Sequence, residues 1–172
     1  MMHSAMISSP VGTLVIEVSK ERLLCGLELL PRGRGMVTSG DTENSVVADA
    51  VEQLGRYFED PEWRFELPLA PGGTPFQQRV WQALQSIPSG ETISYGTLAA
   101  RLGTCARAVG NACRGNPIPI IIPCHRVVGV RGPGGFMGSR AGEPLAIKKW
   151  LLTHESFHDR RKESDISYTE NS

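Results

Sequence analysis

Several features are scarce or absent in this chain, and each absence excludes a class of protein. No apolar run approaches the roughly 18 residues of a membrane span, and Met1–Ser4 does not begin a signal peptide. Cysteines are few and show no C-x-x-C spacing: Cys25, Cys105, Cys113 and Cys124. Such usage is typical of free thiols in a reducing cytosol and makes structural zinc unexpected. We therefore expect a cytoplasmic protein that binds no membrane and no metal.

Acidic residues are also absent from one long stretch of the chain. Between Thr92 and Gly142 there is no Asp or Glu, but there are six arginines: Arg101, Arg107, Arg114, Arg126, Arg131 and Arg140. The chain has 18 basic and 18 acidic residues, so the remainder carries a net charge of minus six. Because arginine pairs well with phosphate, the stretch favours a polyanionic partner. The alternative is that the arginines scatter over several faces.

The same stretch contains an adjacent Cys124-His125 pair, preceded by the apolar run 118–123. The run predicts a buried extended segment that ends at the thiol. A free thiol has a pKa of about 8.5 and is little ionised at neutral pH, so a neighbouring base or cation is needed to activate it. The pair therefore predicts a nucleophile that is shielded from water and reacts with a substrate pushed inside the protein.

Residues 1–70 predict a small α/β domain. Apolar patterns indicate strands at 13–18, 23–29 and 63–69. Apolar residues at helical spacing indicate a helix over 46–58, with Ser45 as a plausible N-cap. The Pro- and Gly-rich segment 70–73 marks the domain boundary.

Residues 74–157 predict a second, mainly helical domain. Thr74, Pro75 and Gln77 form a helix start with a capping box, and this helix ends before Pro88. Two short helices follow, at 98–102 and 105–114. Gly103 ends the first helix, and Thr104 is the predicted N-cap of the second. This spacing predicts a helix-turn-helix, although an ordinary helical hairpin gives the same pattern. We predict a last helix from Pro144 to about Glu155, and a disordered tail over 158–172.

Five segments together resemble the O6-alkylguanine-DNA alkyltransferases, the DNA repair proteins that react once. They are Tyr95, Arg107–Gly110, Arg114–Pro117, Ile122–Gly129 and Lys148–Glu155. The resemblance is strong from about Thr74 to Glu155 and weaker but compatible before it. It implies an α+β fold, with a small ribonuclease H-like α/β domain followed by a mainly helical domain that contains a winged-helix-like helix-turn-helix.

The resemblance also implies a reaction. A monomer would bind double-stranded DNA, flip O6-alkylguanine (chiefly O6-methylguanine) out of the stack, and transfer the alkyl group irreversibly to Cys124, without metal, cofactor or protein partner. O4-methylthymine and larger alkyl groups are left open. Flipping is required because the alkylated oxygen lies inside the duplex.

The family roles transfer onto matching positions of this chain. Cys124 would be the nucleophile, His125 the base acting through a water, and Glu155 the residue that orients His125. Tyr95 would protonate or hydrogen-bond the departing guanine, and Asn116 would hold the turn before the cysteine segment. Arg107 would insert into the duplex, and the other DNA contacts would come from Ala106, Ala108, Gly110, Asn111, Arg114 and Arg126. Besides Tyr95, the base pocket would contain Val127 and Val128, which bind the guanine edge, and Phe136, Met137 and Gly138.

Two classes of alternative function are open. A lesion-binding relative without chemistry would carry another residue in place of Cys124, and a helix-turn-helix regulator would need base-reading side chains where this helix has mostly small ones. A thiol hydrolase would need an oxyanion hole and would turn over.

Overall fold

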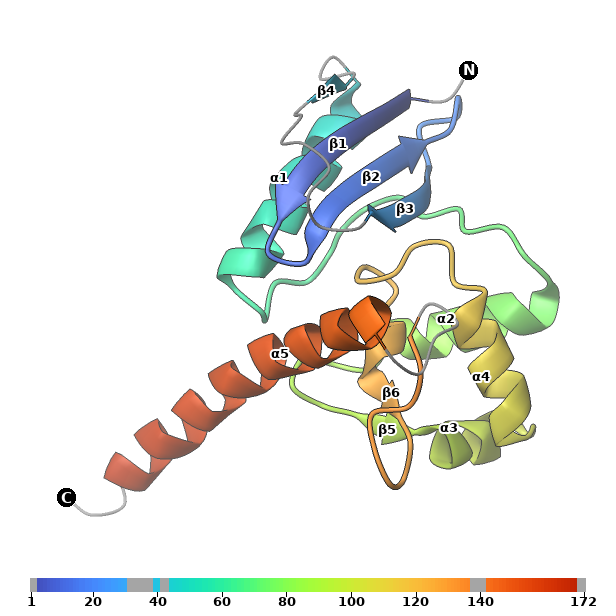
Figure 1. Ribbon diagram of the computed structural model, residues 1–172. Coiled ribbons are helices and arrows are strands. Elements are labelled where there is room, and N and C mark those ends of the chain that lie inside the picture. The colour runs from blue at the N-terminus through green and yellow to red at the C-terminus, as the bar shows by residue number, and fades with distance from the viewer. Residues whose placement is uncertain (1–2, 31–38, 41–43, 137–141, 170–172) are drawn as a thin grey trace.

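The protein has an α+β fold in which an antiparallel sheet with one helix precedes a mainly helical part (Figure 1). The structure, a computed structural model, describes residues 3–30, 39–40, 44–136 and 142–169, with side chains of the last helix through Ser156. Within these ranges, none of the helices combines the length and the apolar character needed to span a membrane.

The sheet has the strand order β3-β2-β1-β4. Its strands are β1 (His3–Ser9), β2 (Gly12–Val18), β3 (Leu24–Leu30) and the two-residue β4 (Ser39–Gly40). The predicted strands at 13–18 and 23–29 correspond to β2 and β3, but β1 was not predicted. Its sequence has few large apolar residues, and only Ala5 and Ile7 of this strand are buried. Its pairing with β2 from His3↔Val18 to Ser9↔Gly12 holds it in the sheet.

Helix α1 (Ser45–Glu59) packs against β1 and β2. The predicted cap is displaced by one residue, because the Asn44 side chain, and not that of Ser45, accepts hydrogen bonds from the backbone of Val46 and Val47. The buried face of α1 consists of Val47, Ala50, Gln53, Leu54 and Tyr57. Tyr57 is therefore directed away from solvent, toward the rest of the core.

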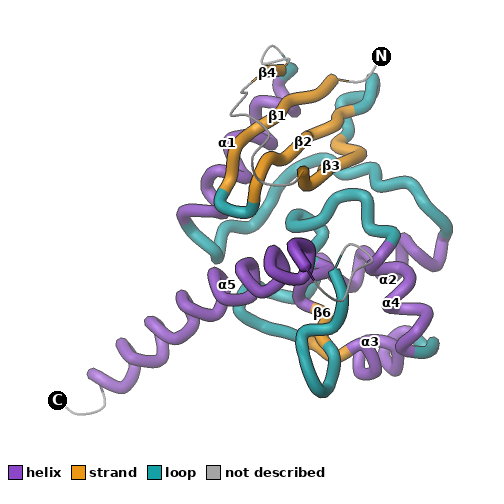
Figure 2. Tube along the Cα trace, viewed as in Figure 1, coloured by secondary structure: helices purple, strands orange, loops and turns teal. Residues whose placement is uncertain are grey.

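The strand predicted at 63–69 is wrong. Its residues alternate in burial, as the pattern indicates, but they form only an isolated bridge between Leu24 and Leu69. The backbone N–H and C=O of Glu66 pair with the Gln53 side chain at 2.8 and 3.1 Å, so they are not available for a strand ladder. The segment is an extended connection that joins α1 to the second part of the chain (Figure 2).

The helical part begins with α2 (Pro75–Gln85), where the predicted capping box of Thr74 and Gln77 is present. Then follow β5 (Ile93–Ser94), α3 (Tyr95–Leu102), α4 (Ala106–Arg114), the short 3-10 helix η1 (Cys124–Arg126) and β6 (Val127–Val128), which pairs in parallel with β5. The Trp81 indole N–H donates to the carbonyl of Ala112 at 2.8 Å and ties α4 to α2.

Helices α3 and α4 contact each other and correspond to the two helices predicted as a helix-turn-helix, although α3 begins at Tyr95, earlier than predicted. Gly103 ends α3 with a φ of 69°, the left-handed conformation that glycine adopts without strain. The predicted Thr104 cap is wrong: Cys105 occupies the N-cap position of α4 and makes no side-chain capping bond. The first turn of α4 therefore leaves backbone N–H groups without a side-chain cap.

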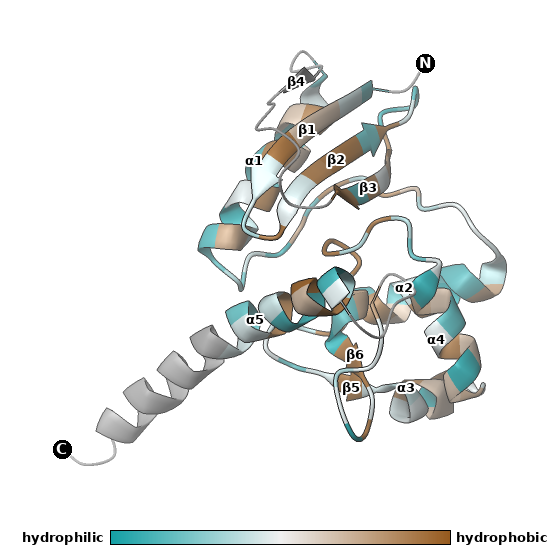
Figure 3. Cartoon of the chain, viewed as in Figure 1, coloured by the Kyte–Doolittle hydropathy of each residue, from teal (hydrophilic) through white to brown (hydrophobic). Residues whose placement is uncertain are grey.

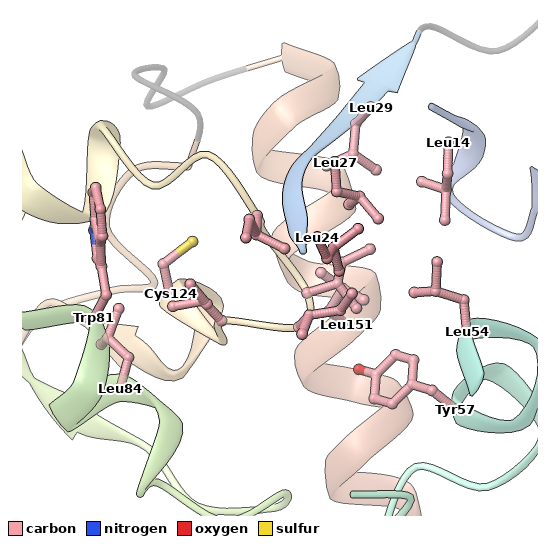
Figure 4. Close-up of a cluster of buried hydrophobic side chains, with 14 of the residues drawn as sticks. Leu14, Leu24, Leu27, Leu29, Leu54, Tyr57, Trp81, Leu84, Cys124 and Leu151 are labelled. Atoms are coloured by element: carbon pink, nitrogen blue, oxygen red, sulfur yellow. The ribbon is translucent and has the colours of Figure 1, made fainter. Parts of the chain in front are cut away.

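The first half of the last helix, α5 (Gly142–Thr169), lies between the two parts of the chain, and its second half extends away from them (Figure 1). It extends beyond the end predicted near Glu155, and its backbone is helical to Thr169 where a disordered tail was predicted. After Pro144 the sequence contains no Gly or Pro to stop it. Figure 3 shows hydrophobic residues along β1, β2 and the first half of α5. These surfaces belong to one core, in which Leu24, Leu54 and Leu151 lie together (Figure 4).

Candidate active site

The segment before Cys124 is a tight buried turn, which corrects the predicted extended conformation. Ile122 N–H donates to the carbonyl of Ile118 at 2.9 Å, closing the turn on itself. Asn116 holds both of its ends, because its Oδ1 accepts from Ile118 N–H at 3.0 Å and its Nδ2 donates to Ile122 O at 2.8 Å. The apolar run therefore explains why the segment is buried, while the hydrogen bonds of the Asn116 side chain hold its backbone in a turn.

Cys124 lies at the edge of the core and is 6% exposed. Burial raises the pKa of its thiol, and the Asn116 side-chain hydrogen bond and the positive charge of Lys148 act in the opposite direction. The raised pKa means that the thiol keeps its proton at neutral pH when no DNA is bound. A base is therefore needed to generate the thiolate.

His125 is fully buried, and its Nε2 lies 2.8 Å from Oε2 of Glu155. Burial alone would raise the pKa of Glu155, but its interactions with His125, and next those with Arg126, lower it to about 2. Since this carboxylate only accepts hydrogen bonds, Nε2 carries the imidazole proton. Burial lowers the pKa of His125, so the ring is neutral at neutral pH. Its Nδ1 is buried and has no partner among the described residues, and it is thus available as a base.

Arg126, predicted to bind DNA, is directed inward instead. Its Nε donates to Oε1 of Glu155 at 2.9 Å, its second amino group donates to Oε2 at 3.1 Å, and the third nitrogen bonds the carbonyl of Ile87. The side chain is only 11% exposed. A buried carboxylate requires a compensating charge, and this pairing takes up the guanidinium that was expected to bind phosphate.

Lys148 is the site residue that sequence reasoning missed. It is fully buried, and its ammonium donates to Val127 O at 2.8 Å, Gly135 O at 2.9 Å and the Tyr95 hydroxyl at 3.3 Å. Burial lowers its pKa, and the nearby Cys124 and Cys113 raise it. A lysine among apolar residues at helical spacing in 145–152 could have indicated a buried cation.

Tyr95, the first residue of α3, has its ring held between Lys148 and Gly134. The Lys148 ammonium lies 5.6 Å from the ring centroid. Gly134 has a φ of 77°, and a Cβ at this position would lie 2.7 Å from Cε2 and 2.9 Å from the hydroxyl oxygen of Tyr95. Glycine is therefore required here, both for the backbone conformation and for the close approach of the loop to the tyrosine.

A cavity of about 610 Å³ connects the thiol to the outer face of α4. Tyr95, Cys124 and Phe136 line it together with Cys113, Arg131 and the glycines of 129–135. The α4 residues on its wall include most of the predicted DNA contacts: Ala106, Arg107, Gly110, Asn111 and Arg114. Arg107 and Arg114 are exposed, whereas Ala108 is half-buried and lies away from the cavity wall.

The predicted base pocket is only partly assembled in the structure. Phe136 lines the cavity, but Val127 and Val128 are not among the described residues that line it, and the carbonyl of Val127 accepts from Lys148. Met137 and Gly138 lie outside the described residues. A carbonyl oxygen has two lone pairs, so contact of the Val127 and Val128 carbonyls with the guanine edge stays a prediction beside the bond from Lys148 to Val127.

Cys113 is a second thiol on the cavity wall. Burial, and next the charge of Cys124, raise its pKa to about 12. This thiol therefore keeps its proton at neutral pH, which disfavours it as the nucleophile.

Comparison with known proteins agrees with this geometry. Residues 2–71 match the family model described as the ribonuclease-like domain of 6-O-methylguanine DNA methyltransferase, and residues 75–157 match the model of its DNA binding domain. The chain is 43% identical to the methylated-DNA–protein-cysteine methyltransferase of Mycolicibacterium paratuberculosis over 156 residues, covering 88% of this chain and 91% of the relative.

Two further relatives extend the comparison. The constitutive methylated-DNA–protein-cysteine methyltransferase of Bacillus subtilis is 37% identical, with 90% of this chain and 95% of the relative covered. The fold is similar to the crystal structure of Mycobacterium tuberculosis OGT in complex with DNA, with a TM-score of 0.71, 40% identity, and 88% and 91% of the two chains covered.

Proposed function

The chain belongs to the O6-methylguanine DNA methyltransferase family, and from this premise we propose that Cys124 is the residue that takes the methyl group. The protein repairs O6-methylguanine by methyl transfer to cysteine, and it binds DNA. The observation that supports Cys124 most strongly is its place in the cavity that opens onto α4, with a buried, neutral imidazole next in the chain.

The activation of the thiol follows from the proton positions at His125. Nε2–H is donated to Glu155, so Nδ1 holds the free lone pair. One water between Nδ1 and the thiol would carry the Cys124 proton to the ring, because a buried polar nitrogen needs a partner. The resulting thiolate is stabilised by Lys148 and Asn116, and Glu155 stabilises the imidazolium.

The transfer itself is a displacement at the methyl carbon. The Cys124 sulfur forms the new S–C bond while the C–O6 bond breaks, and the electron pair stays on the guanine ring. Tyr95 gives its hydroxyl proton to the departing guanine, and the bond from Lys148 to the hydroxyl oxygen lowers the cost of losing that proton. The thioether is stable and no described residue is placed to cleave it, so each molecule reacts once.

The face of α4 supports the proposed approach to the duplex. Its small residues allow close contact with the minor groove, and Arg107 projects from the rim of the cavity where it would replace the extruded nucleotide in the stack. Arg101, Arg114 and Arg131 are exposed and add sequence-independent attraction to phosphates.

The test is mass spectrometry after mixing the protein with a duplex that contains O6-methylguanine. The proposal requires a gain of one methylene mass, saturating at one per chain, on the peptide that contains Cys124. Cys124→Ala should abolish the gain, while Cys113→Ala, on the same cavity wall, should keep it. A mass gain in Cys124→Ala would refute the assignment. Lesion binding without any mass gain in the unmodified protein would favour a non-catalytic lesion-binding protein.

Three smaller predictions accompany this proposal. The division into domains at 1–70 and 74–157 is testable by limited proteolysis within 70–73. The monomeric state is testable by sedimentation with and without DNA. Acceptance of O4-methylthymine is testable by replacing the lesion in the same mass assay.

A further inference from the structure

Tyr57 connects the N-terminal part of the chain to the catalytic carboxylate. It belongs to α1, is fully buried, and donates its hydroxyl proton to Oε2 of Glu155 at 2.7 Å. Figure 4 shows the hydroxyl directed from α1 toward α5. The two residues are 98 positions apart in the chain, so the contact exists only because α5 is packed between the two parts.

Oε2 of Glu155 is a shared acceptor. It receives the Tyr57 hydroxyl at 2.7 Å, His125 Nε2 at 2.8 Å and an Arg126 amino group at 3.1 Å. The three donors share the lone pairs of this one oxygen, so each of them weakens the hydrogen bonds that the oxygen accepts from the others. Tyr57 is therefore in a position to tune how strongly Glu155 holds the proton of His125.

The Tyr57 ring is packed against three other aromatic rings. His154 Nε2 lies 2.9 Å from the Tyr57 carbonyl oxygen, and the rings of Phe58, Phe65 and His154 lie within 5.3 to 5.6 Å of its ring. Burial, and next the negative charge of Glu155, raise the pKa of the Tyr57 hydroxyl well above its ordinary value, so it remains a donor at any pH of interest.

We propose that Tyr57 is a positioning residue for methyl transfer, which acts through Glu155 and makes the N-terminal part of the chain a component of the active site. This inference rests on the function proposed above. A second contact between the parts supports it, because Leu27 N–H of β3 donates to the Pro117 carbonyl at 2.9 Å, at the entrance to the turn that ends at Cys124. The alternative is that the hydroxyl only satisfies its own burial.

Removing the Tyr57 hydroxyl should raise the pKa of His125. In Tyr57→Phe, Oε2 loses a donor and becomes a stronger acceptor for His125, so the imidazolium is stabilised. The other charged and titratable groups that face this site are Arg126, Lys148 and His154, and they are unchanged. We expect the acid limb of the methyl-transfer rate to move to higher pH, so that the rate constant measured on that limb falls about 3- to 10-fold because more of His125 is protonated there.

The experiment measures two quantities in the full-length protein: single-turnover methyl transfer against pH, and titration of the His125 ring by NMR. The control is Gln53→Met, on the same face of α1, which removes the bonds to Glu66 and destabilises the fold without touching Glu155. It should lower stability while leaving the acid limb and the His125 titration unchanged.

A second variant guards against a folding defect and sharpens the test. Incorporation of 3-fluorotyrosine at position 57 keeps the ring and makes the hydroxyl a stronger donor, so the His125 titration should move to lower pH, opposite to Tyr57→Phe. Wild-type titration and rate profiles in both variants would overturn the inference while leaving the proposed function intact. Failure of the unmodified protein to transfer methyl would instead refute the proposed function, and the NMR titration would still decide whether Tyr57 is coupled to His125.

Discussion

Replacing Glu155 by glutamine removes the charge on which the site is built. The carboxylate is 3% exposed and accepts from Tyr57, His125 and Arg126. Its pKa is lowered to about 2 in the fold, by its interactions with His125 and next by those with Arg126, so the carboxyl is fully ionised at neutral pH. Since the substitution also leaves the buried Arg126 without a counter-charge, we expect Glu155→Gln to lose about 3 kcal/mol in urea unfolding at pH 7.

The contribution of Glu155 to stability should depend on pH in a definite direction. A carboxyl whose pKa is lowered in the fold stabilises it above the unfolded pKa, and that contribution disappears as the pH falls through the folded value. The stability difference between wild type and Glu155→Gln should therefore be full above about pH 5 and should narrow between about pH 5 and pH 2. A difference that stays constant across this range would refute the argument, because it would mean that the loss is one of shape and not of charge.

The same variant also tests the role of Glu155 in catalysis. A glutamine side chain can both donate and accept, so it no longer requires the proton to be on Nε2 of His125. The tautomer that leaves Nδ1 free would lose its advantage, and single-turnover methyl transfer should slow by about 100-fold. An unchanged rate in a folded variant would mean that Glu155 does not orient the base.

The remaining predictions concern the cavity and its supports. Lys148→Met should slow methyl transfer by about 10-fold or more and lower stability by about 2 to 5 kcal/mol, because two backbone carbonyls and Tyr95 lose their donor. Quench-flow kinetics measure the first effect and urea unfolding the second. Wild-type kinetics in this variant would exclude Lys148 from the reaction. Gly134→Ala should displace Tyr95 and reduce the transfer rate, with about 1 to 2 kcal/mol lost to the left-handed backbone; a crystal structure with Tyr95 unmoved would contradict this. Arg107→Ala should reduce repair of duplex DNA by about 10-fold but leave reaction with free O6-methylguanine base unchanged, and equal losses on both substrates would mean that Arg107 is not the wedge.

Local sequence signals predicted the helical part well. The capping box of Thr74 and Gln77 and the left-handed Gly103 depend on neighbouring residues alone, so they could be identified without tertiary information. Signals that compete over one or two residues were less reliable. Asn44 caps α1 in place of Ser45, and Cys105 in place of Thr104 precedes α4, because either neighbour is compatible with the helix start.

Pairing between distant segments explains the errors in the sheet. The sequence 63–69 alternates like a strand, but the Gln53 side chain takes the hydrogen bonds of Glu66 that a neighbouring strand would need. Conversely, β1 has few large apolar residues and becomes a strand through its pairing with β2. A period-2 pattern reports which side of a segment is buried, and does not report what its backbone bonds to.

The sequence by itself determined which chemical groups make up the candidate site. They are the Cys124 thiol next to the His125 imidazole, and Glu155, Tyr95 and Asn116 at the spacing of the family, in or near a stretch (92–142) that contains no acidic residue. Only the tertiary structure decided how these groups are charged and paired. It made Arg126, an expected DNA contact, the partner of Glu155, buried Lys148 beside Tyr95, and brought Tyr57 to the carboxylate of Glu155. The physical reason is that burial makes every charge require a partner, and the partner is chosen by the packing of distant segments, which no local pattern encodes.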